Sequence, residues 1–375
     1  MEHKIENMLE VTSYEVLGKL PDLFQMDDGT RLTDPADWEK RRAQMYKTAV
    51  ELQYGTMPPE PEFLEVETLY DSAKTKSFRI ITGTKAHPIS FRMQVLPPKG
   101  KKSGFPIIVD GDGCFKYTTQ AGYVDAALDK GIGWALFDRT ELAHDIQYEG
   151  RRKGDLYEVY PEYTFGALGA WAWGYSRCVD ALLKLGLVDP EWIIFSGHSR
   201  GAKTAMLAGV LDTRAAIVNP NETCAGGCAC YRIHMWAKTL AGENKPSETL
   251  ANLLDKFDFW MGEGMQEYAE RENELPFDSH FLKAMIAPRT LFVSEAAHDP
   301  WSNPIGSWMT TMAAGELFKF LGKEDNLYWY FRDGAHAHLP QDVEMLVSLI
   351  EHKRNGTPLH EDFFRRPFEE KEFIF

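Results

Sequence analysis

The sequence predicts an α/β fold with a mostly parallel central sheet. Short, continuously apolar runs alternate with helix-like segments, and turn residues separate the two. Strands of this kind are buried on both faces, so they need helices on each side of the sheet. A chain of 375 residues with 44% apolar content can build one large core of this type with additions.

The N-terminal part of the chain has a different character. Residues 1–60 are polar and helix-like, and a capped helix start at residues 34–39 leads into a helix that ends near Gly55. We expect residues 1–60 to form a helical arm packed on a main domain of residues 61–375. Three alternating runs between residues 62 and 96 predict an antiparallel beginning of the sheet.

The remaining elements alternate along the chain. Predicted strands occupy residues 105–110, 133–138, 192–196, 215–220, 289–294 and 326–331. Predicted helices occupy residues 124–131, 166–187, the stretch after 201 and about 340–353. We interpret residues 232–285 as a helical insertion into the main domain.

One short stretch carries the chemistry. The pattern Gly-His-Ser-Arg-Gly at residues 197–201 joins a buried apolar run to small residues at helical spacing. A nucleophile elbow requires this sequence of strand, tight turn and helix, because the turn lifts a serine hydroxyl above the sheet edge. A strand-to-helix turn with a capping serine is the plain alternative. We interpret Ser199 as a nucleophile.

The partners of a serine nucleophile also follow predicted strands. Glu222, Asp299 and His336 each lie just past one, as the elbow serine does. The carboxyl ends of parallel strands meet at one edge of a sheet, so these side chains should converge into an acyl-transfer triad. His336 is favoured over His338 as the base because it follows a Gly-x turn at the strand end. The sequence leaves Glu222 and Asp299 open as the acid.

Three more side chains are candidates for contacts with the reacting ester. Arg200 can place a guanidinium beside the oxyanion. Lys203 lies one helical turn further on and can hydrogen-bond sugar hydroxyls. A solvated helix face is the alternative for both. Trp301 can form a sugar-stacking wall or a lid contact, and a glycine-rich loop at residues 111–113 can supply a second oxyanion N–H.

Charge and composition exclude several classes of partner. A net charge of −15 argues against nucleic acid and anionic membranes. No apolar run reaches the length of a membrane span, and the N-terminus lacks the features of a signal peptide. We therefore expect a cytoplasmic protein, unless a leader has been removed.

The cysteines and histidines do not predict a metal centre. Cys224, Cys228 and Cys230 lack zinc-site spacing, and we expect free thiols rather than a disulfide from Cys224 to either neighbour. The His-x-His pair at residues 336–338 has no third clustered ligand in the sequence. We expect neither a metal nor another cofactor.

The elbow and the segments around it resemble a known family. The segments that carry the resemblance are residues 166–174, 197–203, 219–232, 275–280, 286–289, 299–304 and 334–336. Together they are similar to the glucuronoyl esterases of carbohydrate esterase family 15, over roughly residues 100–355. The resemblance implies an α/β-hydrolase three-layer sandwich. It also implies cleavage of esters that join 4-O-methyl-glucuronic acid on xylan to lignin alcohols.

The resemblance further implies residue roles. It makes Ser199 the nucleophile, Glu222 the acid, His336 the base, Arg200 the oxyanion arginine and Lys203 a sugar-binding lysine. Bacterial members often carry an acid at the position of Asp299 and a tryptophan two residues later, as Trp301 is here. By this resemblance Asp299 shares or replaces the role of Glu222, and the chain looks like a bacterial-type member.

The chain also departs from the family pattern. Fungal members carry a cysteine before the nucleophile, bridged to one after the histidine, whereas His198 and Ala337 stand here. Packing must then stabilise the elbow. The missing signal peptide favours smaller uronate esters as substrates. Two other functions stay open, a sugar or xylan O-acetylesterase on the same fold and a catalytically silent hydrolase-fold carbohydrate-binding protein.

Overall fold

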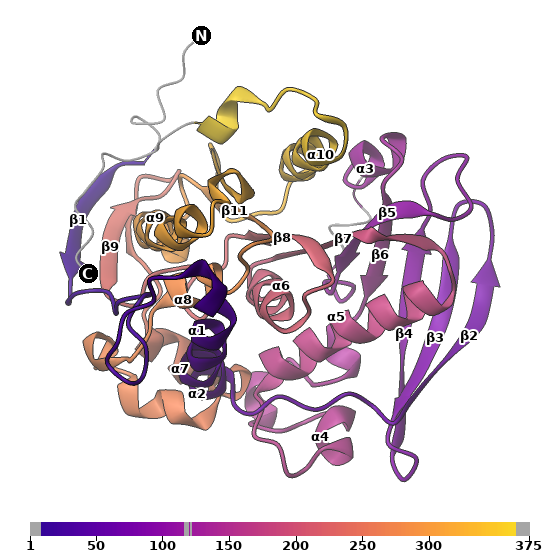
Figure 1. The fold of residues 1–375 in the computed structure, drawn as a ribbon, viewed down its shortest axis with the longest axis horizontal. Coiled ribbons are helices and arrows are strands. Elements are labelled where there is room, and N and C mark those ends of the chain that lie inside the picture. Colours follow the sequence, from indigo (N-terminus) through magenta and orange to yellow (C-terminus); the bar gives the residue numbers. More distant parts are fainter. Residues whose placement is uncertain (1–8, 116–119, 121, 365–375) are drawn as a thin grey trace.

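A large sheet forms the centre of the molecule (Figure 1). The structure is a computed structural model that describes residues 9–115, 120 and 122–364. In the described part of the chain the sheet has nine strands, in the order β12 (Leu327–Arg332), β11 (Thr290–Ala296), β8 (Ala215–Asn221), β7 (Val188–His198), β5 (Phe105–Asp110), β6 (Gly133–Phe137), β4 (Pro88–Leu96), β3 (Lys76–Gly83) and β2 (Phe63–Asp71). The first six are parallel and the last three are antiparallel. The predicted sheet is confirmed.

The central strands divide their side chains between two cores. In β5, Ile107 and Val109 pack into one apolar cluster and Ile108 into the other, and β7 repeats this alternation. Successive side chains of a strand point to opposite faces, so an unbroken apolar run buries both faces. The sheet therefore lies between two helical layers, which makes three layers in all.

Different helices cover the two faces. The larger core includes side chains of α5 (Ala167–Lys184), α6 (Arg200–Leu211), α8 (Ser279–Ala284) and α9 (Pro304–Phe320). The smaller core includes side chains of α3 (Asp125–Asp129) and α10 (Pro340–Asn355), which contact each other. The remaining α-helices are α1 (Trp38–Met45), α2 (Leu52–Tyr54), α4 (Asp155–Val159) and α7 (Leu250–Phe257). α9 has no counterpart among the helices predicted from the sequence.

Two segments expected to be helical also contain strands. β1 (Val11–Val16) pairs with β9 (Ile233–Lys238), and β9 also pairs with β10 (Asn244–Pro246) in a separate small sheet. The helical arm and the helical insertion that we expected contain helices, and also these strands, which were not predicted. The cause is visible in β9, whose buried Ile233, Met235 and Ala237 alternate with half-buried neighbours. This period of two predicts a strand.

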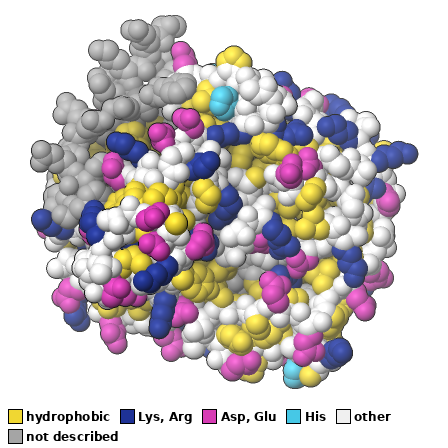
Figure 2. Space-filling view, viewed as in Figure 1, with side chains coloured by type: hydrophobic (Ala, Val, Ile, Leu, Met, Phe, Trp, Pro, Cys, Tyr) yellow, Lys and Arg dark blue, Asp and Glu magenta, His cyan; other side chains and the backbone are white. Residues whose placement is uncertain are grey.

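Neither a membrane-spanning helix in the described residues nor a patch of one charge sign on the face in Figure 2 is present. No helix among the described residues has the length and apolarity to cross a bilayer. On the face in Figure 2, acidic and basic side chains are interspersed, with apolar side chains between them.

Candidate active site

Four neighbouring strands bring the candidate catalytic residues to one edge of the sheet. Ser199 directly follows β7, and Glu222 directly follows β8. Asp299 lies three residues beyond β11, and His336 lies four residues beyond β12. These strands are adjacent in the order β7, β8, β11, β12 and all run parallel, so their carboxyl ends lie together.

The turn at Ser199 has the backbone of a nucleophile elbow. Its φ of 57° and ψ of −119° are rare for a residue with a side chain, and strain of this kind is concentrated at functional sites. The Ser199 N–H donates to the carbonyl of Asn221 at 2.9 Å, which ties the elbow to the end of β8. The serine side chain stands at the N-terminus of α6, where backbone N–H groups lack intrahelical acceptors.

Close packing stabilises this turn without a disulfide. A Cβ at Gly197 would collide with the backbone carbonyl of Gly201, and a Cβ at Gly201 would collide with the Asp112 carboxylate. The same carboxylate accepts the His198 N–H at 2.9 Å and pairs with the fully buried Arg139. The glycines are therefore required by space, and Asp112 joins the elbow to the loop after β5.

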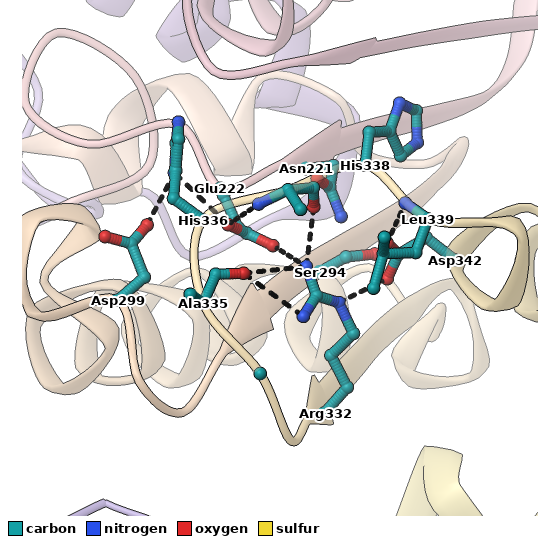
Figure 3. A network of polar contacts seen from close by, with 12 residues as sticks. Asn221, Glu222, Ser294, Asp299, Arg332, Ala335, His336, His338, Leu339 and Asp342 are labelled. Carbon is teal, nitrogen blue, oxygen red and sulfur yellow. Dashed lines mark hydrogen bonds and ion pairs between the residues drawn. The ribbon is translucent and has the colours of Figure 1, made fainter. Parts of the chain in front are cut away.

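His336 lies against both candidate acids (Figure 3). Its Nδ1 donates to Asp299 Oδ2 at 2.6 Å and lies 3.2 Å from Glu222 Oε2. Asp299 and Glu222 are buried, whereas the His336 side chain is 37% exposed. This arrangement fixes the Nδ1–H tautomer and leaves Nε2 as the basic nitrogen.

Glu222 has further partners that Asp299 lacks. Its Oε1 accepts from the Arg332 guanidinium, and its Oε2 accepts from the Ala337 N–H at 3.1 Å. Arg332 is itself buried and also donates to Asp342 at 2.9 Å. Burial raises the pKa of Glu222 to about 7, against the opposing effects of His336 and Arg332. Glu222 therefore holds the loop that carries His336, while Asp299 is the nearer partner of the imidazole.

The two carboxylates change the basicity of His336. Burial alone lowers the pKa of the imidazole, but the hydrogen bonds and negative charges of Asp299 and Glu222 outweigh it and raise the pKa. A carboxylate favours the protonated imidazole because the opposite charges attract.

The pH dependence of activity should reveal this shift. A base must be neutral to accept the serine proton, so we expect the acid limb of kcat/KM to lie above 6.5, the ordinary pKa of histidine. Asp299→Asn removes one negative charge and should move that limb to lower pH. The measurement is kcat/KM against pH for both proteins, and an acid limb in the same place for both would contradict it.

The other histidines near the site are excluded from the role of base by their surroundings. His338 is buried and its Nδ1 contacts the Tyr123 hydroxyl, and burial lowers its pKa well below the usual range. Figure 3 shows it turned away from Glu222 and Asp299. His198 bonds Asn221 at 2.7 Å, and burial and the charge of His336 lower its pKa to about 4. Its ring centroid lies 4.5 Å from that of His336.

Arg200 is held by a carboxylate and by aromatic rings. Its guanidinium donates to Asp145 Oδ2 at 3.0 Å and lies 4.7 Å from the ring centroid of Trp260. The Trp260 Nε1–H donates to Asp145 Oδ1 at 2.9 Å. The Phe257 ring stacks on the Trp260 ring, with the two centroids 3.9 Å apart. Cation–π attraction and the charged hydrogen bond together limit the motion of the guanidinium.

Glu248, which was not predicted from the sequence, contacts both Lys203 and Trp301. The Lys203 ammonium is buried, donates to the Thr223 carbonyl and lies 3.5 Å from Glu248 Oε2. The Glu248 N–H donates to the Trp301 carbonyl at 3.1 Å. Burial raises the pKa of Glu248, against the opposing charge of Lys203. Trp301 is half-buried, and Lys256 lies 5.7 Å from its ring centroid.

Among the described residues, two groups of side chains have the composition of metal ligands. His198, Glu222 and His336 form one, and Cys224, Asp299 and His336 form the other, with ligand atoms within 4.8 Å of one another in each. His338 belongs to neither group. The structure records all five cysteines as free, so Cys224 is not in a disulfide with Cys228 or Cys230.

Three residues of the site were not predicted from the sequence, for different reasons: Arg332, Asp145 and Glu248. Arg332 ends a buried strand, and a charge at that place is a usable signal because buried charges need partners. Asp145 lies in an irregular segment, and Glu248 precedes the capped start of α7. Neither position differs in sequence from an ordinary loop carboxylate.

The strand order and the elbow place this chain among the α/β-hydrolases. Within that class it belongs to the glucuronyl esterase family, since the family model described as "Glucuronyl esterase, fungi" matches residues 80–322. It is 31% identical over 330 residues to a 4-O-methyl-glucuronoyl methylesterase of Podospora anserina, in an alignment that covers 86% of this chain and 64% of that relative. The chain therefore spans just under two thirds of the length of that curated relative.

Solved structures agree with the family. A carbohydrate esterase family 15 glucuronoyl esterase from Caldicellulosiruptor kristjansonii superimposes with a TM-score of 0.83 at 28% identity, covering 96% of each chain. A mutant glucuronoyl esterase from Sporotrichum thermophile, in complex with methyl 4-O-methyl-β-D-glucopyranuronate, gives a TM-score of 0.76 at 26% identity. That alignment covers 94% of this chain and 91% of the other.

Proposed function

We propose that this protein is a serine carboxylesterase that hydrolyses esters of 4-O-methyl-glucuronic acid or glucuronic acid through an acyl-enzyme. The observation that carries the proposal is the 2.6 Å contact of His336 with Asp299, at the sheet edge that also carries the Ser199 elbow. The names of the relatives supply the substrate class: 4-O-methyl-glucuronoyl methylesterase for one, and a methyl glucuronate ester bound to another.

The proposed reaction has two stages, formation and hydrolysis of the acyl-enzyme. Ser199 Oγ attacks the ester carbonyl while His336 Nε2 accepts its proton, and the same imidazole then protonates the departing alcohol. Asp299 holds the imidazole tautomer and stabilises its positive form. Water, deprotonated by His336, hydrolyses the uronoyl-enzyme and regenerates the serine. The oxyanion of each step lies at the N-terminus of α6, beside the Arg200 guanidinium.

Arg200 should act mainly in the transition state. Arg200→Ala removes a positive charge next to the developing oxyanion, so we expect kcat to fall by about 10²- to 10³-fold with a smaller change in KM. Asp145→Asn keeps an acceptor for Trp260 but loses the charged bond to Arg200. It should lower kcat by about tenfold. Steady-state kinetics on one uronate ester measure both.

The matched control for Asp145→Asn is Asp138→Asn. Asp138 caps the short helix Arg139–Glu141 in the same connecting segment. A change in kcat of similar size for the two variants would contradict a specific role of Asp145 in positioning Arg200.

We assign recognition of the sugar to the group formed by Lys203, Glu248 and Trp301. A charged pair beside an indole ring offers a donor, an acceptor and a flat apolar face, which suit sugar hydroxyls and a pyranose ring. In a uronate ester the sugar is the acyl part, and it remains on the serine after the alcohol leaves. These residues therefore contact the sugar in both the ester and the acyl-enzyme.

The deciding experiment compares two ester types. Purified protein is assayed with benzyl or methyl glucuronate and, separately, with acetylated xylo-oligosaccharides, with Ser199→Ala as the blank. We expect turnover of the glucuronate esters to dominate. Preference for the acetylated sugars would identify an O-acetylesterase instead, and no turnover of any ester would leave a carbohydrate-binding protein.

We further infer that the chain is a bacterial-type member. The hydrogen bond between Asp299 and His336 supports this inference. So do the free cysteines, and His198 and Ala337, which stand where fungal members carry the bridged cysteines. In this chain, packing around Gly197 and Gly201 takes the place of the bridge.

A further inference from the structure

A buried thiol lies beside the catalytic acid and base. Cys224 is 2% exposed, and its Sγ lies with a carboxylate oxygen of Asp299 and a ring nitrogen of His336 in a group whose atoms are within 4.8 Å of one another. The mechanism above uses the imidazole and the carboxylate but has no use for the thiol.

The three groups have the chemistry of a zinc site. Thiolate, imidazole and carboxylate are the side chains that bind Zn²⁺, and a thiolate selects Zn²⁺ or Cd²⁺ over Mg²⁺ and Ca²⁺. Bond lengths of about 2.0–2.3 Å in a tetrahedron put ligand atoms roughly 3.3–3.6 Å apart. The ligand atoms of the group at Cys224 lie within 4.8 Å of one another, with Asp299 Oδ2 2.6 Å from His336 Nδ1, so side chains must shift by on the order of 1 Å to reach that spacing.

The group is partly open to solvent and has a neighbour that can act as an extra ligand. The His336 side chain is 37% exposed, so one ligand of the group is in contact with solvent. Glu222 Oε2 lies 3.2 Å from His336 Nδ1, close enough to be the fourth ligand of the ion. Water can take the fourth position instead.

We propose that Cys224, Asp299 and His336 form a site at which Zn²⁺ or a similar thiophilic cation reversibly inhibits the enzyme. Both ring nitrogens of His336 are needed for catalysis, one toward Asp299 and one toward the serine. A cation on either nitrogen removes the base. Binding releases the thiol proton to solvent, and a cation on Nδ1 leaves the single ring proton on Nε2, where it blocks proton acceptance from the serine. No redox change is involved.

The activity test uses metal-free protein and rests on the proposed esterase function. Zn²⁺ is titrated into the benzyl glucuronate assay, with Mg²⁺ as the control ion, and inhibition is expressed relative to the metal-free rate of each variant. We expect Zn²⁺ but not Mg²⁺ to inhibit, EDTA to restore activity, and Cys224→Gly to raise the Zn²⁺ concentration for half inhibition at least about tenfold. The wild type unaffected by Zn²⁺, or inhibited equally by Mg²⁺, would overturn the proposal.

The choice of variants separates the thiol from its surroundings. Cys224 has φ +58°, a conformation that glycine adopts without strain, so Cys224→Gly should fold. Cys228→Ala is the matched control, since Cys228 is equally buried in the same loop but lies outside the ligand group. Equal inhibition of wild type and Cys224→Gly would assign the ion to His198, Glu222 and His336 instead and overturn the role of the thiol.

A second readout does not depend on activity. Co²⁺ bound to a thiolate gives a near-ultraviolet charge-transfer band, which we expect in the wild type, in Ser199→Ala and in Cys228→Ala, but not in Cys224→Gly. A cobalt band in a protein without activity on any ester would disprove the proposed function and retain the metal site. Absence of the band from the wild type would overturn the metal site alone.

Discussion

Ser199→Ala should abolish nearly all esterase activity, with kcat lower by about 10⁴-fold or more. The hydroxyl at the elbow is the attacking atom, and alanine cannot replace it. Cys224 cannot take over, because it is buried and burial raises the pKa of its thiol, which keeps it neutral. Single-turnover and steady-state rates on benzyl glucuronate measure the loss.

The control for this variant lies three residues earlier. Ser196 is buried in β7, and its hydroxyl contacts Asn219 Oδ1 at 3.2 Å, so Ser196→Ala should keep kcat within a few fold. Alanine also has a Cβ, so Ser199→Ala should preserve the elbow backbone and the melting temperature. Activity of Ser199→Ala within tenfold of wild type would rule out the acyl-enzyme.

The sheet and the elbow could be predicted because local sequence determines them. A strand such as residues 192–196 is buried on both faces and needs an unbroken apolar run, while the turn after it has no room for a Cβ at 197 or 201. Both features leave a direct trace in the residue types. The same reasoning placed Glu222, Asp299 and His336 at one sheet edge.

The contacts that distinguish the two acids, and those of Lys203, could not be predicted from local sequence. Whether Asp299 or Glu222 is nearer to His336 depends on Arg332, which draws the Glu222 carboxylate toward β12 from 110 positions away in sequence. Lys203 was expected on a solvated helix face or against a sugar, and the structure shows its buried ammonium beside the Thr223 carbonyl and Glu248, a contact that no local pattern indicates. Such contacts arise from tertiary packing and leave no local pattern.

Asp299→Asn should be the second most damaging change. Its carboxylate is the nearer partner of Nδ1 at 2.6 Å, and an amide at this position can present its N–H₂ and favour the wrong tautomer. We expect kcat to fall by about 10²- to 10³-fold, less than in a triad with a single acid, because Glu222 lies 3.2 Å from the same nitrogen. Stability should change little, since the described contacts of the Asp299 carboxylate are few.

Glu222→Gln should show the opposite balance of activity and stability. It leaves the buried Arg332 with Asp342 as its remaining anionic partner and a neutral acceptor at 222, so we expect a loss of about 1–3 kcal/mol in unfolding free energy and only about a tenfold loss in kcat. Kinetics and denaturant unfolding of both single variants measure the two effects.

The double variant tests whether the two acids act on one imidazole. If each carboxylate partly replaces the other, losing both costs more in kcat than the product of the single losses, because neither single variant is wholly without an acid. Purely multiplicative losses would mean that Glu222 acts only through the loop of His336. A larger kcat loss in Glu222→Gln than in Asp299→Asn would make Glu222 the triad acid and leave Asp299 a supporting role.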